Sequence, residues 1–244
     1  GAGEPWDSTR DTPRLVVVAV PPASAGAVMA EAMRFPDATI TDVTSVKGAP
    51  LASAIASGAD PARLVGGHPM AGREKSGPGA ARLELFDDRP WVVTPTAGTA
   101  QERVQEVIDL ARTCGAVPFV MDPDEHDEAV ALTSHAPQLI SSLLAARLLG
   151  ADAQAVAVSG QGLRDMTRIA GSDPHLWRAI LSANADSVAG VLEAFSDDLE
   201  RVVSDLRSGD GAEVASALTR GSAGRERVPG KHGDAATAYD VVTA

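Results

Sequence analysis

The sequence predicts an α/β domain over residues 1–121, followed by an all-α domain over residues 122–244. Two observations carry this prediction. Up to Met121, short apolar runs typical of buried strands alternate with segments of helical periodicity, an order that favours a parallel sheet. From Asp124 onward, the apolar residues recur only at helical spacing. A chain of 244 residues with 44% apolar content can bury a core of this kind.

The first domain is expected to contain five strands and three helices. Residues 15–20 form a continuous apolar run that ends at Pro21, which is typical of a central parallel strand buried on both faces. The other strands are expected at 39–43, 63–65, 90–95 and 117–121. The helices are expected at 23–33, 50–57 and 99–114, and the last of them carries an apolar stripe at helical spacing.

The second domain is expected to consist of long helices. One helical segment spans 124–149 with a kink or break at Pro137, and another spans 175–206. Their broad apolar faces exceed what one small helical layer can bury, so a homodimer through this domain is expected. The segment after Arg220 is rich in glycine and is expected to be extended.

Composition excludes several classes of protein. The net charge of −12 argues against a nucleic-acid-binding protein, which needs a basic surface. No apolar run approaches the roughly 20 residues of a membrane span, so no membrane-spanning segment is expected, and no signal peptide is expected either. Cys114 is the single cysteine and the five histidines are scattered, so neither a disulfide framework nor a metal site is expected. The expected location is the cytoplasm.

His68 is the strongest candidate for a catalytic residue. It follows the strand expected at 63–65, within the run Gly66-Gly67-His68-Pro69-Met70-Ala71-Gly72. Ligands bind at the carboxyl ends of strands in open α/β sheets, and an imidazole there can act as a general base near neutral pH. The alternative is a loop histidine that only bonds a neighbouring carbonyl group. The glycines, which would hold the backbone open, and the motifs downstream favour the catalytic interpretation.

The run around His68 resembles the prephenate/arogenate dehydrogenase family, which makes the tyrosine precursor by oxidative decarboxylation. The resemblance continues through Glu74, Ser76 and Gly77. Further segments match in the family's order, and several ordered motifs are far more specific than one short pattern. They lie at residues 41–47, 124–127, 134–137, 164–170 and 172–177, and the tail at 224–233 is similar to the extended actinobacterial form.

The resemblance implies an enzyme that converts prephenate to 4-hydroxyphenylpyruvate, or arogenate to tyrosine, with hydride transfer to NAD or NADP. His68 would be the base that acts on the ring hydroxyl. Ser45 would hydrogen-bond near His68 and the nicotinamide, although without the resemblance a helix N-cap is the favoured interpretation. Val20, Pro21, Ser45 and Lys47 are expected to contact the cofactor, and Lys47 could alternatively be a solvated charge.

The resemblance also implies a carboxylate-binding arginine, Arg168, because a guanidinium binds a carboxylate with two parallel hydrogen bonds. The alternative is a helix-surface partner for Asp165 or Asp173. Arg164 lies four residues before Arg168, so the two would share a helix face, where an anionic ligand could separate their charges.

Five further residues are expected near the substrate or the domain junction. His135 is expected at the pocket wall, and Trp177 either reaches the neighbouring subunit's pocket or packs in the dimer core. His126 and the adjacent Asp127 are interpreted as positioning groups that face different ways on a helix. Gln138 stands where many relatives have histidine; glutamine only exchanges hydrogen bonds, which leaves the choice between prephenate and arogenate open.

The glycine-rich turn of a dinucleotide-binding domain, G-x-G-x-x-G, does not occur in the sequence. Gly160-Gln161-Gly162 lacks the third glycine and lies in the helical part. We therefore expect an incomplete Rossmann-like sheet without its first β-α-β unit, and weak or no cofactor affinity.

Two other functions stay open at this point. One is a 4-amino-4-deoxyprephenate dehydrogenase of antibiotic biosynthesis, a relative acting on an amino-substituted substrate. The other is a cofactor-less dimeric binding module derived from the family. The combination of His68, Ser45 and Arg168 argues against the module, because an inactive fold need not keep all three.

Overall fold

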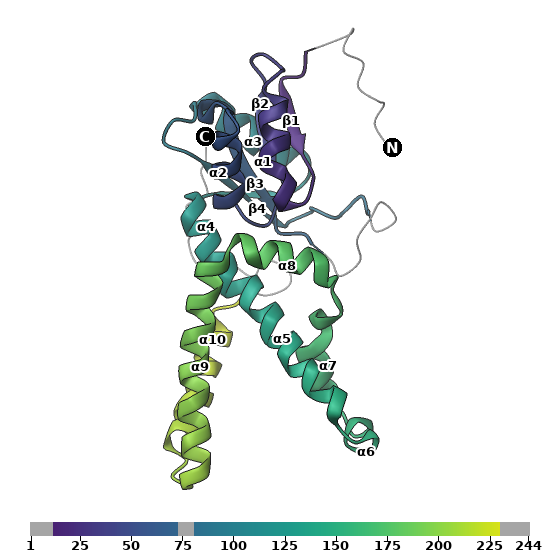
Figure 1. The fold of residues 1–244 in the computed structure, drawn as a ribbon, viewed down its shortest axis with the longest axis vertical. Coiled ribbons are helices and arrows are strands. Elements are labelled where there is room, and N and C mark those ends of the chain that lie inside the picture. The colour runs from purple at the N-terminus through teal and green to yellow at the C-terminus, as the bar shows by residue number, and fades with distance from the viewer. Residues whose placement is uncertain (1–11, 73–80, 230–244) are drawn as a thin grey trace. The chain divides into compact units, whose positions relative to one another are not determined.

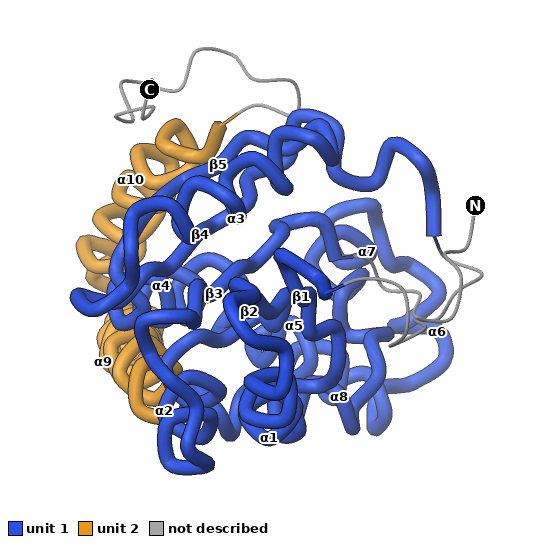
Figure 2. Tube along the Cα trace, turned by 90° about the horizontal axis from the view of Figure 1, so that it is seen from above, with its two compact units in different colours: residues 1–185 blue, residues 186–244 orange. Residues whose placement is uncertain are grey.

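The computed structural model describes residues 12–72 and 81–229 (Figure 1). Glu74, Ser76 and Gly77 of the histidine motif lie outside the described residues, as does the end of the tail segment. The chain divides into two compact units, residues 1–185 and 186–244, which Figure 2 shows in different colours. The sheet and the helices up to α8 belong to the first unit, and the predicted boundary at 121/122 stays a prediction.

The first unit contains a five-stranded sheet in the order β1-β2-β3-β4-β5. Its strands are β1 (Leu15–Val18), β2 (Thr39–Asp42), β3 (Leu64–Pro69), β4 (Pro90–Pro95) and β5 (Val117–Val120). The pairs β1–β2, β2–β3 and β4–β5 are parallel, whereas β3 and β4 are antiparallel. The predicted succession of an α/β sheet and helices is confirmed, with one antiparallel pair that the sequence pattern did not indicate.

Strand β1 corrects one expectation. Among the described strands it lies at the edge of the sheet and pairs only with β2, and 43% of Val17 is exposed. It also ends at Val18, before Val20. A continuous apolar run reports that a strand is apolar on both faces, but it does not report how many neighbours the strand has.

Helices cover both faces of the sheet (Figure 2). On one face, α1 (Pro22–Ala32) and α2 (Gly48–Ala56) pack over a core that includes Ile40 and Leu64. On the other face, α3 (Gln101–Thr113) packs over Val65 and Val93. Successive side chains of a strand alternate between the two faces, so neighbouring residues of β3 enter different cores.

Strand β3 is longer than expected and contains His68, which pairs with Val92 of β4. The preceding glycines do not hold the backbone open. A Cβ on Gly67 would lie 2.7 Å from the backbone oxygen of Asp42, and a Cβ on Gly66 would lie 2.1 Å from Oγ1 of Thr94. The strand therefore continues through residues that only glycine can occupy, because β2 and β4 approach closely.

The helical part begins with α4 (Pro123–Val130), whose N-terminus has a capping box formed by Asp122 and Glu125. A π-helical turn, Ala131–His135, then leads into α5 (Ala136–Ala146). The break expected at Pro137 is thus present as a widened turn before the proline, which has no N–H to donate to the preceding turn.

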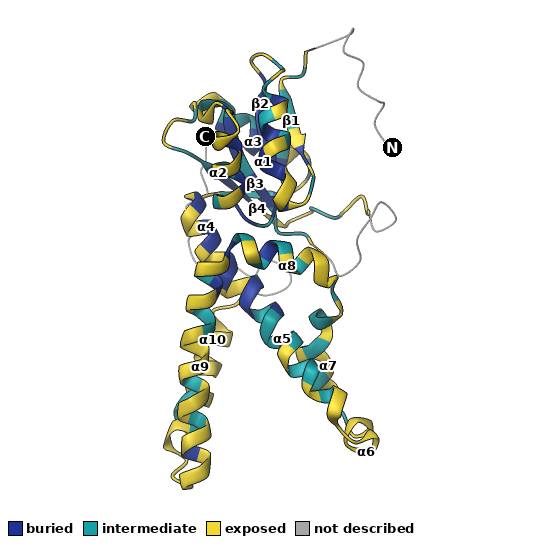
Figure 3. Cartoon of the chain, in the orientation of Figure 1, coloured by how far each residue is buried: buried dark blue, intermediate teal, exposed yellow. Residues whose placement is uncertain are grey.

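Short helices follow, and then the longer helix α8. The short elements are the 3-10 turn Arg147–Gly150, α6 (Ala153–Ala157), α7 (Gln161–Thr167) and the 3-10 turn Arg168–Gly171. Asp173 is the N-cap of helix α8 (Pro174–Ala183), and its carboxylate accepts a hydrogen bond from the backbone N–H of His175. Figure 3 shows that buried residues gather in the strands, in α4 and in the first part of α5.

The second unit consists of α9 (Ala185–Ser208) and α10 (Ala212–Glu226). The helix predicted at 175–206 is interrupted at Asn184, between α8 and α9. The extended tail predicted after Arg220 is wrong, because α10 continues to Glu226. The Asp205 carboxylate accepts hydrogen bonds from the backbone N–H groups of Gly211 and Val214. It thereby provides an acceptor for N–H groups at the start of α10 that have no partner within the helix. In the described ranges, every helix is too short or too polar to span a membrane.

Candidate active site

Three side chains form a hydrogen-bonded chain where β3 meets α4. Nδ1 of His68 lies 2.8 Å from Nε2 of His126, and Nδ1 of His126 lies 2.8 Å from Oδ1 of Asp127. The exposed fractions are 9% for His68, 0% for His126 and 7% for Asp127. The expectation that His126 and Asp127 face different ways is wrong: the His126 ring turns back toward the carboxylate of its neighbour.

Asp127 is held in place by the start of α2. Its Oδ1 accepts the backbone N–H of Lys47 at 2.8 Å and its Oδ2 accepts that of Gly48 at 2.9 Å. No side chain of the α2 segment itself caps this helix, so a carboxylate from α4 satisfies its free N–H groups. Burial alone would raise the pKa of Asp127, but the hydrogen bonds from His126, Gly48 and Lys47 outweigh it and lower the pKa.

Lys47 forms a buried ion pair with Asp42, next to the residue that precedes His68 in β3. Its Nζ donates to Oδ2 of Asp42 at 2.5 Å and to the carbonyl oxygen of Gly67 at 2.6 Å, and its side chain is 1% exposed. The alternative of a solvated charge is therefore wrong. Burial lowers the pKa of Lys47, although the Asp42 carboxylate opposes that shift. The ion pair ties the end of β2 to the strand that carries His68.

His68 is suited to act as a base. Burial lowers its pKa well below the usual 6.5, and the Lys47 ammonium lowers it further, with smaller contributions from the neighbouring His126 and His135. The imidazole is therefore neutral at neutral pH, as a proton acceptor must be. Within the described ranges its Nε2 makes no hydrogen bond, whereas its Nδ1 is bonded to His126.

His135 lies in the π-helical turn and is 1% exposed. Its Nδ1 is 3.2 Å from Nδ2 of Asn184, which also donates to the backbone oxygen of Asp127 at 2.7 Å. Its Nε2 is buried and has no hydrogen-bond partner among the described residues. Burial lowers the pKa of His135 to about 4. Asn184 bonds to Nδ1, so the neutral ring carries its proton on Nε2, and that buried N–H lacks a hydrogen bond to a described residue that would offset its burial.

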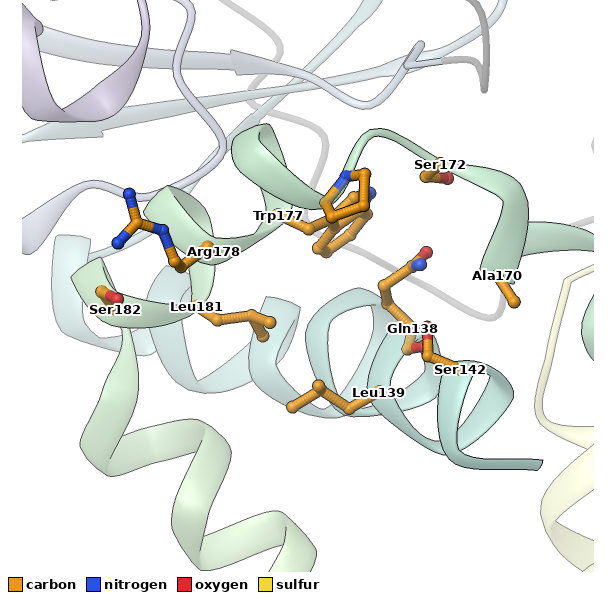
Figure 4. Close-up of a pocket in the computed structure, with 10 residues that line it drawn as sticks. Gln138, Leu139, Ser142, Ala170, Ser172, Trp177, Arg178, Leu181 and Ser182 are labelled. Carbon is orange, nitrogen blue, oxygen red and sulfur yellow. The ribbon is translucent and has the colours of Figure 1, made fainter. Parts of the chain in front are cut away.

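A cavity of about 310 Å³ lies between α5 and α8 (Figure 4). Trp177 lines it, and its indole meets the ring of His135 edge to face, with centroids 6.1 Å apart. The side chain of Gln138 reaches this cavity, and its Nε2 donates to the backbone oxygen of Ile169 at 2.9 Å. Arg178 supplies a cation at the cavity wall. His135 does not line the cavity itself and lies next to it through its ring contact with Trp177.

The two arginines of the motif, Arg164 and Arg168, are not among the residues that line the cavity between α5 and α8. Arg164 is exposed on α7 and donates to the backbone oxygen of Ser159 at 3.0 Å. Arg168 is exposed at the start of the 3-10 turn that Gln138 holds through Ile169. Their roles toward a substrate carboxylate stay predictions.

The residues expected to contact the cofactor lie near adjacent strand ends. Val18 of β1 pairs with Asp42 of β2, so the two parallel strands end at the same level. The segments that follow them therefore leave the sheet at its carboxyl end. Val20 and Pro21 lie on one segment, and Ser45 lies on the other. Ser45 makes no hydrogen bond within the described residues and does not cap α2.

Three residues of the site were not identified from the sequence: Asp42, Arg178 and Asn184. Asp42 had a signal, because a carboxylate at the end of a buried strand must find a partner. Asn184 had a weaker one, since it interrupts the helical periodicity between 175 and 206. Arg178 on α8 had none, because a surface arginine of a helix looks the same whether or not a cavity lies beside it.

Two family descriptions match the chain. Residues 4–120 match "Prephenate dehydrogenase, nucleotide-binding domain", and residues 122–220 match "Prephenate dehydrogenase, dimerization domain". A probable prephenate dehydrogenase of Streptomyces niveus is 39% identical over 234 residues, which cover 91% of this chain and 65% of that relative. Cyclohexadienyl dehydrogenase of Zymomonas mobilis is 33% identical over 204 residues, covering 81% of this chain and 69% of the relative. The chain therefore spans about two thirds of the length of these relatives.

Solved structures agree with this similarity. Prephenate dehydrogenase from Aquifex aeolicus, in complex with hydroxyphenyl propionate and NAD+, has a TM-score of 0.79 and 28% identity, covering 89% of this chain and 77% of that one. Synechocystis arogenate dehydrogenase has a TM-score of 0.75 and 25% identity, covering 87% and 78% of the two chains.

Proposed function

The chain belongs to the prephenate dehydrogenase family, and from this membership we propose that its site oxidatively decarboxylates prephenate to 4-hydroxyphenylpyruvate, or arogenate to tyrosine. The observation that carries the proposal is His68, a buried neutral imidazole with one nitrogen bonded to His126 and the other without a hydrogen bond to any described residue. A general base for a ring hydroxyl needs such a nitrogen.

The reaction requires the loss of a hydroxyl proton and a hydride at one ring carbon. The ketone-like ring then loses carbon dioxide and becomes aromatic, which makes the reaction effectively irreversible. His68 takes the hydroxyl proton, and the fixed position of β3 between β4 and the Asp42–Lys47 pair holds the imidazole in place. NAD or NADP, when bound, supplies the hydride acceptor.

The chain has residues for the nicotinamide end of that cofactor. The Ser45 hydroxyl, open to a new hydrogen bond within the described residues, and the half-buried Val20 and exposed Pro21 fit a flat, amide-bearing ring at the edge formed by β1 and β2. Lys47 contributes indirectly, because its ammonium donates its hydrogen bonds to Asp42 and Gly67 and so joins the ends of β2 and β3. The glycine-rich turn that binds a pyrophosphate is not in the sequence, so we expect weak affinity.

Arg168 binds a substrate carboxylate in this proposal, with Arg164 on the preceding turn adding positive charge. Gln138 and Trp177 bound the side-chain end of the substrate, and His135 offers its unpaired Nε2 to a substrate oxygen. These assignments rest on the positions of the residues in the family motifs and on the cavity between α5 and α8.

Gln138 favours arogenate over prephenate. A carbonyl oxygen only accepts hydrogen bonds, so the amide nitrogen of Gln138 must face Ile169, which leaves the amide oxygen for a ligand. An amide oxygen is an acceptor, which suits the ammonium group of arogenate and not the keto group of prephenate. The nearby Trp177 ring suits a cation as well.

A homodimer through the helical part completes the proposal. The part of the chain that matches a dimerisation domain includes α9, which exposes several apolar side chains. Packing them against a second copy would remove them from water. These side chains are Phe195, Leu199, Val203 and Leu206.

The test is the absorbance of reduced cofactor when the purified chain is given prephenate or arogenate with NAD⁺ or NADP⁺. We expect turnover with arogenate to exceed turnover with prephenate. Absence of turnover in all four combinations would contradict the proposed activity for this chain.

A further inference from the structure

The chain of hydrogen bonds from His68 to Asp127 fixes more than the position of a ring. Each of its links joins two heavy atoms 2.8 Å apart, and all three side chains are buried. The two imidazole planes cross at 73° with centroids 5.1 Å apart, so the rings meet through their nitrogens and are not stacked. Such an arrangement specifies which nitrogen holds each proton.

The specification starts at Asp127. Its pKa is lowered, because hydrogen bonds from His126 and from the backbone of Gly48 and Lys47 outweigh its burial, and an ionised carboxylate can only accept. Nδ1 of His126 must therefore donate to it. In a neutral His126 the other nitrogen, Nε2, is then an acceptor.

The second link follows from the first. Since Nε2 of His126 accepts, Nδ1 of His68 must donate, and the lone pair of a neutral His68 lies on Nε2. Nε2 is also the nitrogen without a hydrogen bond in the described part of the chain.

We propose that His126 and Asp127 are positioning residues for catalysis, which hold the proton of His68 on Nδ1 and so make Nε2 the basic nitrogen. This inference rests on the proposed function. In the proton-transfer step the O–H bond of the ring hydroxyl breaks, its electron pair stays on the oxygen, and a new N–H bond forms at Nε2. The Nδ1–H bond remains intact and donates to His126.

The surroundings of His68 explain why a carboxylate is needed at the end of the chain. The protonated imidazole faces the ammonium of Lys47, which Asp42 partly neutralises, and the rings of His126 and His135. The chain of hydrogen bonds that starts at His68 ends at the negatively charged carboxylate of Asp127 on α4. Through His126 it stabilises the positive charge that His68 gains.

The first experiment reads the tautomer directly, by NMR correlation of ring nitrogens and ring carbon-bound protons in the ¹⁵N-labelled chain at pH 7.5. We expect His68, assigned by its loss in His68→Asn, to carry its proton on Nδ1. Because the tautomer is read in the unsubstituted chain and without substrate, with His68→Asn used only to assign the signal, the measurement stands even if the proposed activity fails. A wild-type His68 protonated on Nε2 would overturn the inference.

Two substitutions of His126 provide a matched pair. His126→Gln keeps an acceptor for His68, whereas His126→Leu does not, and His175→Leu, which removes an exposed histidine of α8, is the control. We expect His68 to keep its Nδ1 proton in His126→Gln and in the control, and to lose that preference in His126→Leu. An unchanged tautomer in a folded His126→Leu chain would contradict the inference.

Kinetics then separate positioning from binding. We expect His126→Leu to lower kcat on the order of 10²-fold with little change in KM, and the acid limb of the pH profile to move. His126→Gln should recover most of kcat. A change confined to KM, or equal losses in the two variants, would overturn the positioning role without touching His68 as the base.

Discussion

Oδ2 of Asp127 accepts the backbone N–H of Gly48 at 2.9 Å, across 79 positions of the sequence. The acceptor lies on α4 and the donor begins α2, so one carboxylate both starts a helix and ends the hydrogen-bonded chain that leads to His68. Local folding of α2 and the orientation of the candidate base are therefore coupled through a single side chain.

Replacing His68 should remove catalysis while leaving the fold intact. In an active form of the protein, His68→Asn should lower kcat by about 10² or more, because asparagine cannot take the hydroxyl proton. Reduced-cofactor absorbance measures the loss, with His175→Asn as the control for removal of an exposed histidine. Retained turnover in His68→Asn would end the assignment of the base.

Arg168 should act mainly in substrate binding. The side chain is exposed, so Arg168→Ala should raise KM by about 10-fold, which corresponds to roughly 1.4 kcal/mol and is typical of a hydrogen bond to a charged group. Arg147→Ala, at an exposed arginine of the 3-10 turn after α5, is the matched control. Equal KM values in the two variants would remove Arg168 from the carboxylate site.

Gln138 should set the substrate preference. Gln138→His replaces the free acceptor oxygen near Trp177 by a group that can carry positive charge, so the ratio of kcat/KM for arogenate to that for prephenate should fall by about 10-fold. The measurement is the pair of kcat/KM values for each protein, with Ser142→Ala at the same cavity as control. A ratio that stays constant would show that Gln138 does not distinguish the substrates.

The buried pair of Lys47 and Asp42 should behave cooperatively in unfolding. Lys47→Met or Asp42→Asn alone leaves a partner buried without its counterion, and each should lower the free energy of unfolding by about 3–5 kcal/mol. The double variant should lose less than the sum of the two. Urea unfolding of the four proteins gives this cycle, and strictly additive losses would argue against a direct pair.

Stability should fall as the pH decreases below about 6.5. The unfolded chain binds a proton on His135 near pH 6.5, whereas the folded chain binds it only near pH 4, so between these values the unfolded state binds more protons and lower pH favours unfolding. His68, whose pKa is also lowered, adds in the same direction. Urea unfolding at several pH values measures the slope, which should be shallower in His135→Asn; an identical slope would refute the contribution of His135.

Much of the fold could be predicted from periodicity, but the site could be predicted only in part. The apolar pattern located the five strands and α3, because burial of one face leaves its mark on the sequence. It placed His68 beyond its strand, since Gly66 and Gly67 read as a loop when the close approach of Asp42 and Thr94 is not known. The prediction for the tail was wrong because Gly221 and Gly224 suggested a coil, whereas α10, whose start bonds to the Asp205 carboxylate, continues through both glycines to Glu226.

The π-helical turn Ala131–His135 has a consequence for how the two other imidazoles reach His68. His126 and His135 are nine residues apart, and at about 100° per residue a regular α-helix would rotate through about 900°, which places them on opposite sides. The widened turn winds more slowly, and both rings come near enough to lower the pKa of His68. Any change that straightened this turn into a regular helix would separate the two histidines by half a rotation without altering either of them.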